Sequence, residues 1–268
     1  MDTTGSLPRG LQLLRLLGDG GPDGQRLSDV AEAAGLPRPT AHRLLRMLVA
    51  EGFVEHDAAA RRYRLSLELF LLASRAGNPT GLRDLCRPAL LRLTASLGET
   101  VFLLVHNGYD AICIDRSAGP LPIRSFTGDI GGRVPLGLGQ GSTAILACLP
   151  EEEREDIIRH NLPIIRNLGG SDEPVLRAEI TRVRQEGYSI MPGVLPGMAG
   201  LGVPLLDRDG RAVAALSIGT TTDRLGTDRR DLVANLLRAE ANAIAPRLNP
   251  FDPALRRAGA AMEGSPAR

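Results

Sequence analysis

The sequence predicts an α+β protein with an N-terminal winged helix-turn-helix and a C-terminal antiparallel sheet flanked by helices. Residues 27–48 carry apolar side chains at helical spacing on both sides of a central glycine. Residues 53–65 hold two short strand-like runs around a polar loop. Beyond residue 80, strand-like hairpins are interrupted by helical segments, which is typical of an antiparallel sheet covered by helices.

The composition is that of an ordinary globular protein with room for two domains. The 268 residues are 43% hydrophobic and 24% charged. Because the net charge is only +1, any affinity for nucleic acid must come from a local patch. The chain has no Trp and 3% aromatic residues, which argues against a single-strand binder that stacks bases on aromatic rings.

The remaining totals exclude several classes of protein. Cys86, Cys113 and Cys148 are odd in number and lack metal-ligand spacing, so we expect reduced buried thiols, no disulfide and no metal site. No apolar run approaches the roughly 20 residues that span a membrane, and no signal peptide is recognisable. We therefore expect a cytoplasmic protein without membrane contact.

The helix-turn-helix begins after a polar, loosely structured stretch at residues 1–10 and a first helix whose leucines lie between residues 11 and 17. The next helix should start at Ser28, whose hydroxyl can cap free backbone N–H groups. Gly35 should end it in a left-handed conformation, and Pro37 prevents its continuation.

The second helix of the pair should begin near Pro39 and bury a stripe formed by Ala41, Leu44, Leu45 and Leu48. The residues expected to contact DNA are Ser28, at the start of the first helix, and those of the opposite face and the leading end of the second: Arg38, Thr40, His42, Arg43 and Arg46. Arginine can fork onto guanine, and threonine can contact a phosphate or a thymine methyl. The alternative is an ordinary helical hairpin with a solvated basic face.

A β-hairpin over residues 53–65 would form the wing, where Arg61, Arg62 and Arg64 are placed to reach phosphates. Residues 38–64 contain six arginines against three acidic residues. Such a local surplus of positive charge favours binding to a polyanion such as nucleic acid.

This segment resembles the winged-helix domain of the IclR family of bacterial transcriptional regulators, whose second helix typically runs GLP-x-x-TAHRLL. Residues 35–37 and 40–45 match that motif, whereas Pro39 stands where the family usually has Ser. The resemblance implies double-stranded operator DNA as the partner, bound by a homodimer or tetramer.

Residues 66–80 predict a linker helix that is apolar almost all round, and such a helix must be covered on more than one side. It packs either on its own domains or, as the resemblance implies, between subunits. Asn78-Pro79 marks the boundary. The domains are therefore expected at 1–65 (winged helix-turn-helix), 66–80 (linker), 81–248 (effector-binding) and 249–268 (disordered tail).

In the C-terminal domain, the patterns predict helices at 81–97, 142–148, 151–159, 173–185 and 228–248. They predict strands at 101–105, 111–115, 123–126, 188–190, 201–206 and 211–220. This order of elements resembles the IclR effector-binding domain, which implies a GAF-like fold. Together the two resemblances cover about residues 8–248.

A glycine-rich loop at residues 137–143 leads directly into a helix, where free N–H groups attract anions. By resemblance it lines the effector pocket, opposite a second wall at 196–204; alternatively it is only a tight turn. The expected ligand-binding residues are Gly139, Gln140, Gly141, Ser142, Gly200 and Ser217. Because Gly200 stands where many members have Cys, we expect a roomy apolar pocket for a small organic acid whose carboxylate meets the loop.

Catalysis has little support in the sequence. His106, Asp115 and Ser125 have no spacing that favours a triad, so we expect no catalytic residue, no enzyme activity and no cofactor. The sequence therefore predicts a transcriptional regulator whose operator affinity is controlled by an effector. The alternative is a small-molecule-binding or catalytic domain whose winged helix makes protein contacts.

Overall fold

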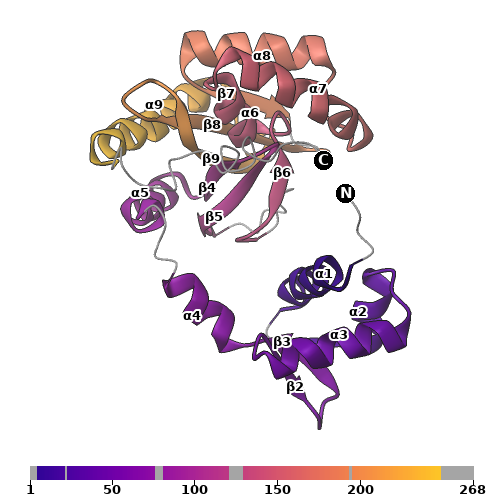
Figure 1. Ribbon diagram of the computed structural model, residues 1–268. Coiled ribbons are helices and arrows are strands. Elements are labelled where there is room, and N and C mark those ends of the chain that lie inside the picture. Colours follow the sequence, from indigo (N-terminus) through magenta and orange to yellow (C-terminus); the bar gives the residue numbers. More distant parts are fainter. Residues whose placement is uncertain (1–4, 22, 76–80, 121–128, 193–194, 249–268) are drawn as a thin grey trace. The chain divides into compact units, whose positions relative to one another are not determined.

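The computed structural model describes residues 5–21, 23–75, 81–120, 129–192 and 195–248. The chain divides into two compact units, Met1–Asn78 and Pro79–Arg268 (Figure 1). The strand expected at 123–126 and the tail expected to be disordered at 249–268 lie outside the described residues.

The first unit has the predicted helix-turn-helix and wing. Its elements are α1 (Ser6–Asp19), β1 (Gln25–Arg26), α2 (Leu27–Ala33), α3 (Arg38–Ala50), β2 (Val54–Asp57), β3 (Arg62–Leu65) and α4 (Leu67–Arg75). The strands form an antiparallel sheet in the order β1-β3-β2. Its core joins α1, α2, α3 and the wing through Leu13, Leu17, Val30, Leu44, Leu45, Val54 and Tyr63.

Two local predictions in this unit need correction, and one short strand was not predicted. Helix α1 begins at Ser6, within the stretch expected to be loose, because Gly10, Leu13 and Leu17 share one buried face. Strand β1 was not predicted, since two residues carry no periodic pattern. Because β1 runs straight into α2, Ser28 lies inside the first turn; its hydroxyl contacts Asp29 Oδ1 at 2.9 Å and does not cap the helix.

The second unit is a six-stranded antiparallel sheet between layers of helices. Its elements are α5 (Leu82–Leu97), β4 (Thr100–Asn107), β5 (Asp110–Ser117), β6 (Arg133–Pro135), α6 (Gln140–Ala147), α7 (Glu151–Asn167), α8 (Glu173–Glu186), β7 (Ser189–Pro192), β8 (Met198–Leu206), β9 (Ala212–Thr221), α9 (Thr227–Ile244) and a short 3-10 turn (Ala245–Arg247). The strand order is β6-β5-β4-β9-β8-β7. This confirms the predicted α+β class.

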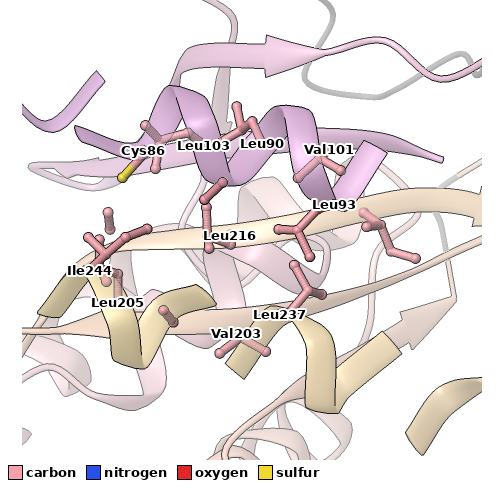
Figure 2. Packing of buried hydrophobic residues seen from close by; sticks show 14 of the residues in the cluster. Cys86, Leu90, Leu93, Val101, Leu103, Val203, Leu205, Leu216, Leu237 and Ile244 are labelled. Atoms are coloured by element: carbon pink, nitrogen blue, oxygen red, sulfur yellow. The ribbon is translucent and has the colours of Figure 1, made fainter. Parts of the chain in front are cut away.

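Each face of this sheet has its own apolar core. Helices α5 and α9 cover one face, where Leu90, Leu93 and Leu237 meet strand residues such as Leu216 (Figure 2). Helices α6, α7 and α8 belong to the other core, which includes Phe102 and Leu104 of β4. We call this second side the α6 face.

On the α6 face, one predicted helix was too short and one strand was not predicted. Helix α7 continues to Asn167, past the expected end at residue 159, because Asn161 anchors its second half. The Asn161 side-chain amide donates hydrogen bonds to the carbonyls of Tyr109 (2.7 Å) and Leu136 (3.0 Å), two groups distant in sequence. Strand β6 was missed because its three residues are too few for a pattern.

Candidate DNA-binding surface and effector site

The predicted faces of α3 are present in the structure. Ala41, Leu44 and Leu45 are buried, whereas His42, Arg43 and Arg46 are exposed on the opposite side. Among the described residues, the ion pairs include none of Arg38, Arg43 and Arg46. These guanidinium groups are therefore available to an external anion.

A basic hollow of about 630 Å³ lies between α2, the first turns of α3 and the turn of the wing. Its charged and polar lining brings together Arg26, Ser28, Arg38, His42, His56 and Arg61. Sequence reasoning missed Arg26 and His56, because neither belongs to the helical motif and only the folded wing places them beside it. The hollow brings three guanidinium groups together. Guanidinium groups bind phosphate through charge-assisted hydrogen bonds, so a phosphate is a suitable ligand for this hollow.

The turn of the wing is held by the carboxylate of Asp57. Asp57 Oδ1 accepts hydrogen bonds from the backbone N–H groups of Ala59 and Ala60, each at 2.9 Å, and these bonds lower the pKa of Asp57. Arg61 then adopts φ +55°, a left-handed conformation that is uncommon for a residue with a side chain. This turn leaves Arg61 exposed at the rim of the hollow.

The other two wing arginines have partners within the unit. Arg62 is half-buried, and its Nη1 donates a 2.7 Å hydrogen bond to the carbonyl of Gly24. Arg64 forms an exposed ion pair with Glu55 Oε2 at 2.8 Å. The structure thus distinguishes three residues that the sequence treated as equivalent.

Replacing Arg62 by alanine should therefore do more than remove a positive charge. We expect the first unit to lose about 0.5–1.5 kcal/mol of stability, because the carbonyl of Gly24 loses its partner. Urea unfolding should show this loss, and Arg61→Ala should leave the stability within about 0.5 kcal/mol of the wild type. Equal stability of the two variants would contradict a structural role for Arg62.

In the second unit, the sheet register places two of the predicted ligand residues, Gly200 and Ser217, in two rows on the α6 face. One row pairs Thr100, Gly219, Gly200 and Met191 across four strands. The next row joins Arg116, Phe102, Ser217, Gly202 and Ser189 across five. The first row has two adjacent glycines, so the sheet offers a floor without side chains there.

The start of α6 rests directly on these rows. A Cβ atom on Gly202 would lie 2.7 Å from the carbonyl oxygen of Gln140 and 2.9 Å from Cα of Gly141. A Cβ atom on Gly141 would lie 2.9 Å from Ser217 Oγ. The structure therefore brings Gln140, Gly141, Gly200 and Ser217 together, although they are separated by up to 77 positions in the chain.

Gln140 occupies the space above Gly200. Its Nε2 donates a 2.9 Å hydrogen bond to the carbonyl of Ile218 and lies 2.1 Å from the position that a Cβ on Gly200 would take. The small residue at 200 is thus filled from above by a long residue at 140. Gly139, the residue before α6, has φ +81°, which suits only glycine.

The hydroxyls in the first turn of α6 already donate their protons to carbonyls just before the helix. Ser142 Oγ, which is buried, donates to the carbonyl of Leu138 at 2.6 Å. Thr143 Oγ1 donates to the carbonyl of Gly139 at 2.7 Å. An anion at this end of the helix would therefore meet backbone N–H groups rather than these side-chain hydroxyls.

Other reactive groups of the second unit have structural roles. His106 lies in β4, its Nε2–H donates to the carbonyl of Gly108 at 2.7 Å, and burial lowers its pKa. Burial raises the pKa of the Cys86 thiol to about 12 and that of Cys113 to about 11, so both are protonated at neutral pH. Within the described ranges, no three His, Cys, Asp or Glu side chains are placed to hold a metal ion.

Two family profiles match the chain. One, described as the IclR helix-turn-helix domain, matches residues 6–58. The other, described as the C-terminal domain of the bacterial transcriptional regulator IclR, matches residues 76–246. The chain belongs to the IclR family of bacterial transcriptional regulators. It is thus a helix-turn-helix regulator with a C-terminal ligand-binding domain, as predicted.

In two relatives, the sequence similarity extends over most of both aligned chains. The transcriptional regulator KipR of Bacillus subtilis (strain 168) is 27% identical over 224 residues, which cover 83% of this chain and 89% of KipR. The transcriptional repressor AllR of Escherichia coli (strain K12) is 29% identical over 245 residues, which cover 91% and 90% of the two chains. Both alignments span the two units.

Solved IclR structures share the fold. The IclR protein of Thermotoga maritima superimposes with a TM-score of 0.71 at 24% identity, covering 91% of this chain and 98% of its own. An IclR homologue of Microbacterium hydrocarbonoxydans in complex with 4-hydroxybenzoate gives a TM-score of 0.74 at 24% identity, covering 90% and 98%. In the part of this chain that the structure describes, none of the helices combines the length and apolar character needed to cross a membrane.

Proposed function

We propose that this IclR-family regulator represses transcription by binding double-stranded operator DNA through α3 and the wing. The proposal rests mainly on the exposed face of α3, where Arg43 and Arg46 stand opposite a buried leucine stripe. A helix that is anchored on one side and presents arginines on the other can enter the major groove and read guanine. AllR, named as a repressor, supports the direction of the effect.

The basic hollow supplies the second half of the proposed interface. Arg26, Arg38 and Arg61 surround it, and a DNA backbone phosphate seated there would set the register of α3 in the groove. Contacts with phosphates add affinity for DNA of any sequence, whereas contacts of α3 with the bases make binding sequence-specific. The wing arginines paired within the protein contribute less than the sequence alone suggested.

We further propose that the chain acts as a homodimer. Leu7 and Leu11 of α1 are 71% and 43% exposed, and Leu67 and Leu71 of α4 are 65% and 37% exposed. Each pair is four residues apart and thus on one face of its helix. Such apolar faces are expected to be covered by a second copy, which would also supply the second half-site reader.

The test is to select bound sequences from random DNA with the purified chain. The expected product is an inverted repeat whose half-sites lie about one helical turn, or a multiple of it, apart. A gel shift with the chain's own upstream region provides an independent check. Recovery of no sequence preference, with binding that is equally strong to all DNA, would contradict the proposed operator recognition.

The effector that we propose is a small organic acid with an apolar body, bound over the glycine floor at Gly219, beside the Gln140 side chain that fills the space above Gly200. The ligand named for the Microbacterium homologue, 4-hydroxybenzoate, has this chemistry. The backbone N–H groups at the start of α6 would receive its carboxylate. Binding would favour one placement of the two winged helices and change the affinity for the operator.

A thermal-shift screen of small carboxylates tests the effector class. A ligand present at 100 times its Kd should add about 2.7 kcal/mol of stability, which raises the Tm by about 5 °C or more in a unit of this size. The ligand that stabilises the protein should also change the gel shift with operator DNA. If no acid in a broad panel raises the Tm, the proposed effector class is wrong.

A further inference from the structure

One strand residue in the two rows that form the proposed effector floor carries a charge. Of the nine residues in the two rows, Arg116 alone is charged. The register places Arg116 of β5 directly beside Phe102 of β4. Phe102 in turn pairs with Ser217, which lies under the start of α6. Arg116 and the helix start therefore stand on opposite sides of Phe102, separated by two strand spacings, or about 10 Å.

A bulge in β5 determines on which face of the sheet the Arg116 side chain lies. The pairing shifts between Leu103 and Leu104, so that Ile114 is the extra residue. Asp115 consequently turns to the opposite face, where it is buried and pairs with Arg87 of α5 at 3.1 Å. Arg116 is thereby directed to the α6 face instead of the α5 face.

The present partner of Arg116 is weak. Its Nε lies 3.1 Å from Asp129 Oδ1, but the two side chains are 34% and 74% exposed. Ion pairs this open to solvent contribute at most about 1 kcal/mol, because water and salt screen them. Arg116 can therefore exchange Asp129 for another carboxylate at low cost.

We propose that Arg116 is the residue that selects carboxylate effectors, and that Asp129 holds its guanidinium until the effector binds. This inference rests on the proposed function and refines it, since it places the carboxylate of the same ligand on Arg116 instead of on the N–H groups at the start of α6. The guanidinium would pair with the carboxylate of the acid over Phe102, while the apolar body lies on the glycine floor. A neutral ligand of the same shape would gain nothing from Arg116.

The experiment compares two probes of equal shape, 4-hydroxybenzoate and 4-hydroxybenzamide, by titration calorimetry with the full chain. The wild type should bind the acid at least tenfold more tightly than the amide. Arg116→Met should lower the affinity for the acid at least tenfold and leave the affinity for the amide within about twofold. Asp129→Asn should raise the affinity for the acid several-fold, because the competing carboxylate is gone.

Arg133→Met is the matched control. Arg133 is an exposed arginine on the adjacent strand β6, paired loosely with Asp110 at 3.8 Å, and its loss should change neither affinity. Thermal unfolding verifies that all variants fold, since Arg116 and Arg133 are both partly exposed.

The possible failures are distinguishable. If the wild type prefers the acid and Arg116→Met keeps that preference, the role of Arg116 is wrong while the proposed effector class stands. A lower affinity for the acid in Asp129→Asn would likewise overturn the holding role of Asp129. If neither probe nor any acid of the wider panel binds the wild type, the effector class and the inference fall together.

Discussion

Replacing Gly202 by alanine should abolish effector binding and lower the stability of the second unit by about 1–3 kcal/mol. The added Cβ would lie 2.7 Å from the carbonyl oxygen of Gln140, 2.8 Å from its carbonyl carbon and 2.9 Å from Cα of Gly141. All three are backbone atoms, so no side-chain rotation can relieve the overlap. The start of α6 must move away from the sheet, and the backbone N–H groups there no longer face the floor.

Urea unfolding and the ligand-dependent rise in Tm measure the two effects of Gly202→Ala. Gly226→Ala is the control, because a Cβ there meets nothing within 4 Å and Gly226 has an ordinary φ of −63°. We expect the control to lose less than about 1 kcal/mol, since Gly226 precedes α9 and alanine is a poorer N-cap than glycine. Normal ligand response in Gly202→Ala would show that the contact of α6 with β8 is not required for binding.

The second large effect is expected on the DNA side, for Arg43→Ala. Arg43 lies exposed on α3, and apart from a 3.7 Å contact of Nη1 with Met47 Sδ it has no partner among the described residues. Loss of a fork onto guanine should lower specific affinity by about 1–3 kcal/mol and relax the preference at one base position of each half-site.

Arg61→Ala should behave differently because Arg61 lies at the rim of the basic hollow. We expect weaker binding to all sequences alike and a salt slope reduced by about one. Arg15→Ala, which removes an exposed arginine from α1, controls for charge alone. The selection experiment, repeated with each variant at two salt concentrations, separates the outcomes. Identical operator preference in Arg43→Ala and the wild type would refute the placement of α3 in the groove.

Local sequence patterns were sufficient to predict α3, the helix proposed to enter the major groove. The buried and exposed sides of α3 follow from a period of 3.6 residues, and Gly35 takes the left-handed φ of +63° expected for the turn before it. The helix starts were less secure. Ser28 fitted the rule for an N-cap, but the pairing of Arg26 with Arg62 moves the start of α2 one residue earlier.

Long-range contacts decided what local patterns could not. Arg62 bonds to a carbonyl 38 positions away, so nothing near it in the chain distinguishes it from Arg61. In the effector site, the resemblance to the family predicts Gln140 and Gly200 as ligand-binding residues. It does not predict that the Gln140 side chain fills the space above Gly200. Phe102, Arg116 and Gly202 were not selected at all, because their common row depends on the register of three strand pairs.

The sequence by itself therefore determined which helices form, which side of α3 carries its arginines, and which family the chain resembles. These depend on neighbours within a few turns or on a motif read directly from the residues. The tertiary structure alone decided which arginines remain free and which residues lie beneath the start of α6. The reason is that one position of strand register, or one bulge such as Ile114, turns a side chain to the opposite face without changing any local pattern.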